Sequence, residues 1–266
     1  IEVSAVTRRK FYLIVLLLSL FFILEIAYLT TRLLRENLYL FSLSAYNAKK
    51  VDSSLTTGCS PPNKKQGYLI SYSPSNNEEW LCGINNADYI FEYINNEGLL
   101  AYDSIFLSKD PYKPSPISST KKISIDDIPS FAFSNSLNRI YSKNQKATYI
   151  FVTMNYNAFS NFIYDKGYYT HFKNTRTDID AIDYKPILIS NIIIQYTDNY
   201  KGIANLYESG HGKGILFSGE RAIDIEWEKA GSSPIKIKDT NGNDITLLEG
   251  KTWWIILNKN CYLTYN

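Results

Sequence analysis

The chain has 266 residues, 45% of them hydrophobic, which is enough to bury a core and excludes wholesale disorder. A formal net charge of +2, from 28 Lys and Arg against 26 Asp and Glu, gives no basic field of the kind that nucleic-acid binding needs, so no nucleic-acid partner is expected. Three cysteines and two histidines are too few for a disulfide scaffold or for most zinc sites, and no metal or cofactor is expected.

The first predicted element is an apolar segment at residues 11–29, FYLIVLLLSLFFILEIAYL, which only Ser19 and Glu25 interrupt. A helix of this length rises about 28 Å, close to the thickness of a bilayer core of about 30 Å. The segment is longer than the apolar region of a cleavable signal peptide and lacks a small-residue cleavage site. The sequence therefore predicts a transmembrane helix, with a buried core helix as the alternative.

Charges at the two ends of this segment favour a cytoplasmic N-terminus only slightly. Arg8, Arg9 and Lys10 precede it, whereas Arg32 and Arg35 follow it. Residues 1–10 are then cytoplasmic, and residues 30–63 form a juxtamembrane stalk or linker with Ser, Thr, Gly and Pro punctuation. The prediction is a single-pass protein of the cell membrane whose C-terminal part is extracytoplasmic.

Residues 64–185 are predicted to form a mixed α/β domain. Runs rich in Tyr, Ile and Phe indicate strands at 67–73, 87–94, 99–107 and 147–154, with a hairpin turn at 95–98. Residues 109–122 are punctuated by proline and predict a surface loop. Asn155 and Gly167 can begin and end a short helix between them.

Residues 186–266 are predicted to form a mainly antiparallel β domain. A nearly continuous apolar run at 187–196, a clean alternation at 221–229 and a final strand at 252–257 support this. Asn241-Gly242 suits the type I′ turn of a hairpin over 234–248. The predicted fold class is therefore α+β: a transmembrane helix, a mixed α/β portion and a C-terminal β portion.

Four sequence elements follow one another in an order that resembles the YerB-like family. They are INNADYIFEYINNEGLLAYDSIFLS at 84–108, KATYIFVTMNYNAFSNFIYDKGY at 146–168, NIIIQY with SGHGKGILFSGERAIDIEWEK up to residue 229, and IKDTNGNDITLLEGKTW at 237–253. That family consists of bacterial envelope lipoproteins with a domain of unknown function. The resemblance covers about residues 84–257.

The departures from the family pattern imply a degenerate N-terminal half. Leu100-Ala101 stands where the family has Thr-Arg, and Thr148-Tyr149-Ile150 where it has Pro-His-Asn. The family's long section after Ser108 is replaced by the proline loop. Because these changes remove polar groups that bind anions or transfer protons, the resemblance implies a non-catalytic member, and no catalytic residue is predicted.

Asp88 and Glu92 match the family pattern and could share one face of a strand. Two carboxylates without a cationic or nucleophilic companion are weak evidence for acid–base chemistry. Two interpretations stay open: they are structural or solvated, or they line a ligand site.

The segment GHGKG offers a second candidate site. Gly210, Gly212 and Gly214 could expose backbone N–H groups to a phosphate, with Lys213 as its counter-charge. A strand rather than a helix follows, so a tight β-turn is the favoured interpretation and an anion cradle the alternative.

His171 and His211 have no Cys or His neighbour at ligand spacing and are predicted to lie on the surface. Cys59 and Cys82 could form a disulfide outside the cytoplasm, although their spacing does not require one.

The predicted function is a membrane-anchored, non-catalytic interaction module of the bacterial cell envelope that binds a protein or a glycan. One alternative is an enzyme acting on a lipid-linked or anionic envelope polymer, because one span followed by an outer α/β domain resembles the layout of LytR-CpsA-Psr-like phosphotransferases. The arginines that such chemistry uses are missing here. The other alternative is a structural subunit of a membrane complex.

Overall fold

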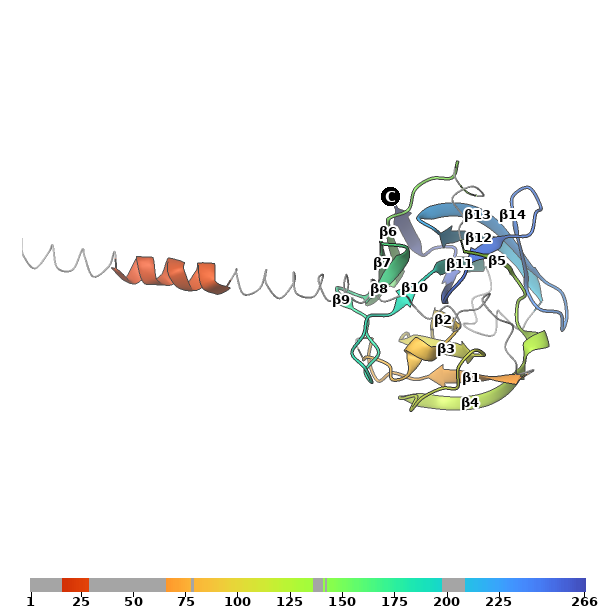
Figure 1. Ribbon diagram of the computed structural model, residues 1–266, viewed down its shortest axis with the longest axis horizontal. Coiled ribbons are helices and arrows are strands. Elements are labelled where there is room, and N and C mark those ends of the chain that lie inside the picture. Colours follow the sequence, from red (N-terminus) through yellow and green to blue (C-terminus); the bar gives the residue numbers. More distant parts are fainter. Residues whose placement is uncertain (1–15, 29–65, 78, 136–140, 142, 198–208) are drawn as a thin grey trace, which may run out of the picture. The chain divides into compact units, whose positions relative to one another are not determined.

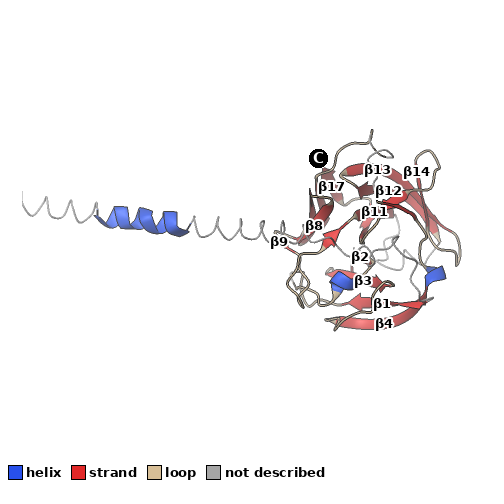
Figure 2. Ribbon diagram, viewed as in Figure 1, coloured by secondary structure: helices blue, strands red, loops and turns tan. Residues whose placement is uncertain are grey.

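The computed structural model describes residues 16–28, 66–77, 79–135, 141, 143–197 and 209–266. It divides the chain into two compact units, residues 1–51 and residues 52–266. The described residues of the second unit form mainly β-strands with short 3-10 helices between some of them (Figure 2). The predicted stalk at 30–63 and Cys59 lie outside the described residues.

The prediction of a transmembrane helix at 11–29 is wrong. The structure describes a helix over residues 16–28. Within the described ranges, no helix is both long enough and apolar enough to cross a membrane.

The prediction of a mixed α/β portion is also wrong, because the region expected to contain a helix forms a β-hairpin. The chain turns at residues 155–157, where the Asn157 N–H donates to its neighbour Asn155 Oδ1 at 2.8 Å. The following strand buries Phe162 completely and leaves Ile163 exposed, which is strand periodicity. Asn and Gly at the ends of this run end strands as readily as they cap helices.

A nine-stranded sheet forms the larger layer of the second unit (Figure 1). The C-terminal portion was predicted to be mainly antiparallel, and its strands β12, β13, β14 and β17 do pair antiparallel with their neighbours. However, β16 pairs in parallel with both β11 and β2. In spatial order the strands are β14 (Lys236–Asp239), β13 (Arg221–Lys229), β12 (Gly210–Ser218), β11 (Asn191–Thr197), β16 (Thr252–Asn258), β2 (Tyr89–Ile94), β3 (Leu100–Phe106), β1 (Gln66–Tyr72) and β4 (Ile117–Ser124).

A smaller sheet packs against one face of the larger one. In the larger sheet, most of β4 lies in the segment that was predicted to be a surface loop. The predicted hairpin turn at 95–98 is confirmed, because it joins the antiparallel strands β2 and β3. The smaller sheet has the order β10 (Leu188–Ile189), β8 (Tyr168–Lys173), β7 (Ala158–Asp165), β6 (Tyr149–Asn155) and β17 (Tyr262–Tyr265), with β9 (Arg176–Thr177) beside β8; β15 (Thr246–Leu248) pairs separately with β5 (Ala132–Ser134).

The predicted hairpin around Asn241-Gly242 is only partly formed. The turn closes where Asp239 N–H donates to the Asn243 carbonyl at 2.8 Å. Gly242 has a positive φ of 83°, but Asn241 does not, so the turn is not type I′. Beyond the turn, β15 leaves β14 and pairs in parallel with β5.

Both faces of the nine-stranded sheet are buried over its centre. In β16, Trp253 and Ile255 face the smaller sheet, whereas Trp254 and Ile256 face the layer that contains β5 and β15. A strand covered on both faces favours apolar residues on both faces, which explains the consecutive apolar residues Ile192–Ile194 of β11 and Trp253–Leu257 of β16. The two hydrophobic cores are therefore separated by this sheet.

Candidate functional site

Glu92 lies in β2 and points into the space between the two main sheets, where it is completely buried. Its Oε1 accepts hydrogen bonds from Ser160 Oγ at 2.6 Å and from Tyr102 OH at 3.4 Å. Its Oε2 accepts one from Trp253 Nε1 at 2.7 Å. Three donors from three strands hold this carboxylate in place. They also offset the free-energy cost of burial, which would be large for a charge without hydrogen-bond partners.

A second group of buried polar side chains lies beside Glu92. His171 Nδ1 is 2.8 Å from Asp178 Oδ2, and Lys173 Nζ is 3.7 Å from Asp178 Oδ1. Burial acts to raise the pKa of Asp178, but the charge of Lys173 and the hydrogen bond with His171 outweigh it and hold that pKa below its usual value.

Aromatic rings connect these groups into one interior polar cluster, made of Glu92, Ser160, His171, Lys173 and Asp178. The His171 ring lies 4.2 Å from the Trp253 ring, and Lys173 Nζ lies 4.8 Å from the Tyr102 ring centre. No member of the interior polar cluster exposes more than 3% of its surface, so a ligand in solution cannot reach it. The prediction that His171 lies on the surface is therefore wrong.

Sequence analysis identified Glu92 but missed the other four members of the interior polar cluster. A signal was present in β8, where Tyr169, His171 and Lys173 alternate with outward-facing residues. This alternation did not predict a buried cluster, because the sequence alone does not show that the inner face of β8 packs against β2 and β16.

Asp88 lies just before β2 and does not join Glu92. Its Oδ2 accepts from the backbone N–H groups of Leu107 at 2.6 Å and Ser108 at 2.9 Å, and its Oδ1 from Ser108 Oγ at 2.6 Å. Burial raises the pKa of this carboxyl, against the effect of these hydrogen bonds. Asp88 therefore anchors the chain at the end of β3, while Glu92 is enclosed between the sheets.

The glycines of GHGKG lie within strand β12, so the predicted β-turn is wrong. None of the three has a positive φ. A Cβ at Gly214 would collide with the carbonyl oxygen of Ile194 on the neighbouring strand. A Cβ at Gly212 would lie 2.8 Å from Trp227 Nε1, which donates to the Tyr196 carbonyl at 3.0 Å. Gly210 likewise lies under the Trp227 ring. The glycines are needed for close packing on one face of β12.

The other face of β12 carries His211 and Lys213, both exposed. Residues directly opposite each other on antiparallel strands share a face, so register defines two rows of exposed side chains. This charged ladder consists of Lys213, Glu226 and Lys238 in one row and His211, Glu228 and Lys236 in the other. Each ladder lysine thus lies opposite a glutamate, which is unlike an anion-binding cluster.

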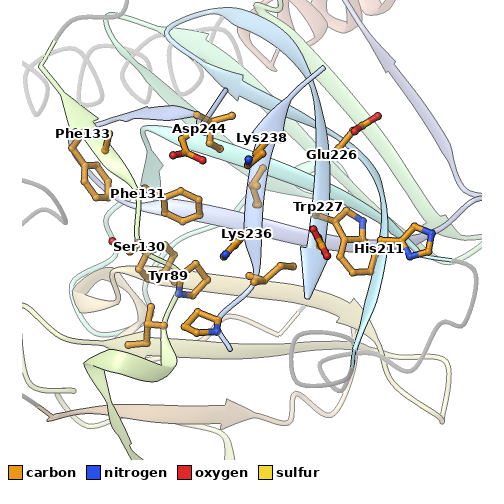
Figure 3. A pocket seen from close by; sticks show the side chains of 18 of the residues that line it. Tyr89, Ser130, Phe131, Phe133, His211, Glu226, Trp227, Lys236, Lys238 and Asp244 are labelled. Carbon is orange, nitrogen blue, oxygen red and sulfur yellow. The ribbon is translucent and has the colours of Figure 1, made fainter. Parts of the chain in front are cut away.

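The charged ladder borders a cleft of about 1650 Å³ at the β14 edge of the large sheet. Figure 3 shows Tyr89, Phe131 and Phe133 on one side of the cleft and Trp227 with His211 on the other. Gly212 and Lys213 also line it, whereas Gly210, Gly214, Asp88 and Glu92 do not. The cleft therefore brings together only two of the predicted ligand-binding residues.

The walls of the cleft combine apolar rings with charges of both signs. Lys213, Lys236 and Lys238 are offset by Glu226 and Glu228 on the ladder, and Asp126 and Asp244 add further negative charge at its border. Among the residues that the structure describes, no three His, Cys, Asp or Glu side chains are grouped as metal ligands, and Cys82 and Cys261 are free.

Comparison with known proteins matches part of the chain to a family of proteins. Residues 150–254 match the family model of the C-terminal domain of a protein of unknown function, DUF3048. This range begins in β6 and ends in β16. No curated protein matches the sequence.

The crystal structure of YerB from Bacillus subtilis is similar in fold, with a TM-score of 0.58 at 14% sequence identity. The match covers 81% of this chain and 97% of the YerB chain. Residues 150–254 are therefore identified as a DUF3048 C-terminal domain, and the fold of the chain is similar to that of YerB.

Proposed function

We propose that this protein is a non-catalytic binding module of the bacterial cell envelope, whose cleft beside β14 holds an extended segment of a partner polypeptide. The extracytoplasmic location rests on the resemblance of the sequence to YerB-like envelope lipoproteins and stays a prediction. The observation that carries the binding role is that the hydrogen-bonded carboxylates and imidazole of the interior polar cluster are separated from the accessible cleft. The interior polar cluster is enclosed, whereas the cleft is open to solvent.

The composition of the cleft supports a polypeptide as the ligand. Apolar side chains of a peptide can pack on Phe131 and Phe133, and its charged side chains can pair with either sign on the charged ladder. The edge strand β14 adds backbone groups next to these side chains. An anionic polymer fits less well, because a glutamate lies opposite each ladder lysine. The same feature argues against the alternative of an enzyme that handles anionic polymers.

The test is selection of random dodecapeptides against the immobilised full-length chain. We expect one family of related sequences to be enriched, and their binding to fall about tenfold or more in Lys236→Glu/Lys238→Glu, where the charge of the ladder is reversed. The matched control is Lys121→Glu/Lys122→Glu, which changes two exposed lysines on β4 at the opposite edge of the same sheet.

Failure to enrich related peptides would contradict the proposal. So would peptides that bind the β14 double variant and the wild type equally well, since they would occupy another surface.

A further inference from the structure

The outer face of the six-stranded sheet is a second accessible surface, distinct from the cleft. Strand periodicity directs Ile150 and Val152 of β6 into the core and Tyr149, Phe151 and Thr153 outward. The outward side chains of β6, β7 and β17 are half-buried or exposed, so the described residues leave this face open to solvent.

Register arranges the outward side chains in rows that mix rings with hydroxyl or amide groups. Tyr262, Thr153 and Phe159 form the first row across β17, β6 and β7. The second row runs from Thr264 through Phe151 and Asn161 to Phe172 on β8, and the third from Tyr149 to Ile163. No side chain in these rows carries a charge. We call these three rows the neutral aromatic face.

The Phe151 ring contacts two other rings of the neutral aromatic face. The Phe151 ring centre lies 5.6 Å from that of Phe159 and 6.4 Å from that of Tyr262, so the group extends over three strands. Tyr262 is 62% exposed. Rings held by a sheet lose little conformational entropy when a ligand packs on them.

The polar side chains between the rings are also held in place. Tyr149 OH donates to Asn161 Oδ1 at 2.9 Å, and Asn161 Nδ2 donates to the Asn174 carbonyl at 2.7 Å. Each of these groups keeps capacity for a further hydrogen bond. Ordered rings therefore alternate with available donors and acceptors.

We propose that the neutral aromatic face binds an uncharged polysaccharide. A pyranose ring presents C–H groups on its flat side, which pack on aromatic rings, and hydroxyl groups at its rim, which hydrogen-bond to amides and hydroxyls. The absence of charge in all three rows matches a neutral ligand and disfavours an anionic one. A second copy of the chain packed on this face would use the rings but would bury the amide and threonine groups between them, which costs free energy unless each finds a partner.

The experiment titrates the full-length chain with cellohexaose, chitohexaose and dextran sulfate by calorimetry, in a polyoxyethylene detergent, because glucoside or maltoside detergents would compete. We expect at least one neutral hexasaccharide to bind and dextran sulfate not to bind. Tyr262→Ala should weaken binding about tenfold or more, because an exposed stacking ring contributes a large part of such an affinity. Phe151→Ala tests the centre of the three-ring group, with its melting temperature as a check on folding.

Two controls separate this proposal from the cleft. Tyr184→Ala removes a tyrosine that is 69% exposed elsewhere, and should leave hexasaccharide binding unchanged. Lys236→Glu/Lys238→Glu should also leave it unchanged, so either proposal can fail without the other.

Either of two kinds of result would overturn the proposal. One is a failed binding test, which means no hexasaccharide binding at millimolar concentration or equal binding by Tyr262→Ala and the wild type. The other is a concentration-dependent dimer in sedimentation that Ile163→Glu dissociates, which would make this face a surface for a second copy.

Discussion

Both histidines of the chain lie in β-strands, yet one is enclosed inside the protein and the other faces water. His171 has a carboxylate partner at 2.8 Å and aromatic rings around it, and its Nε2 has no hydrogen-bond partner among the described residues. His211 lies opposite Glu228 on the charged ladder. The interior polar cluster and the charged ladder thus contain the same types of residue in different roles. The cluster stabilises the fold, whereas the ladder presents charges to solvent.

The largest expected effect comes from removing the central carboxylate of the interior polar cluster. Glu92→Ala leaves Trp253 Nε1 and Ser160 Oγ buried without an acceptor. We expect the free energy of unfolding to fall by about 3–5 kcal/mol. Urea denaturation followed by tryptophan fluorescence measures it, with Glu228→Ala on the charged ladder as the matched control. A loss below about 1 kcal/mol would show that the cluster contributes little to the fold.

Next in size is the effect of a side chain at Gly214. Gly214→Val forces a Cβ against the Ile194 carbonyl oxygen, and backbone atoms of a central strand move little. We expect a loss of about 2–3 kcal/mol. Lys213→Val introduces the same side chain one residue earlier, on the exposed face of β12, and should change stability by less than about 0.5 kcal/mol. Similar melting temperatures for both variants would contradict the packing role of the glycines.

A smaller effect is expected in the pH dependence of stability. The folded-state pKa of Asp178 is lowered, so its ionised form stabilises the fold above the unfolded-state pKa of about 3.9. That contribution is lost as the pH falls through the lower folded value. As the pH falls from about 5 to about 2.5, the free energy of unfolding should decrease more steeply for the wild type than for Asp178→Asn. Asp224→Asn, on the exposed side of β13, is the control and should follow the wild type.

The smallest effects are expected on the charged ladder itself. Glu226→Gln and Lys238→Gln each remove one charge from exposed cross-strand neighbours, and the free energy of unfolding should change by less than about 0.5 kcal/mol. Peptide binding in the cleft should change nevertheless. Thermal melts beside peptide titrations test both statements, and a loss of stability comparable to that of Glu92→Ala would remove the distinction between the two regions.

The sequence by itself determined most strands of the second unit. Alternation at residues 221–229 and the apolar runs that became β11 and β16 are local patterns, and the structure contains strands at each of them. The order of motifs likewise predicted the similarity to YerB. The apolar segment at 11–29 was as clear a local pattern, but among the described residues no helix is long and apolar enough to cross a membrane.

Only the tertiary structure decided what the polar residues and glycines of those strands do. His171 is buried because β8 packs against β16, and the glycines of β12 are needed because Trp227 and Ile194 approach from neighbouring strands. Parallel pairing of β11 with β16 and of β15 with β5 joins segments that are distant in sequence. Periodicity shows which residues share a face of a strand, but whether that face meets another layer or water depends on contacts between distant segments.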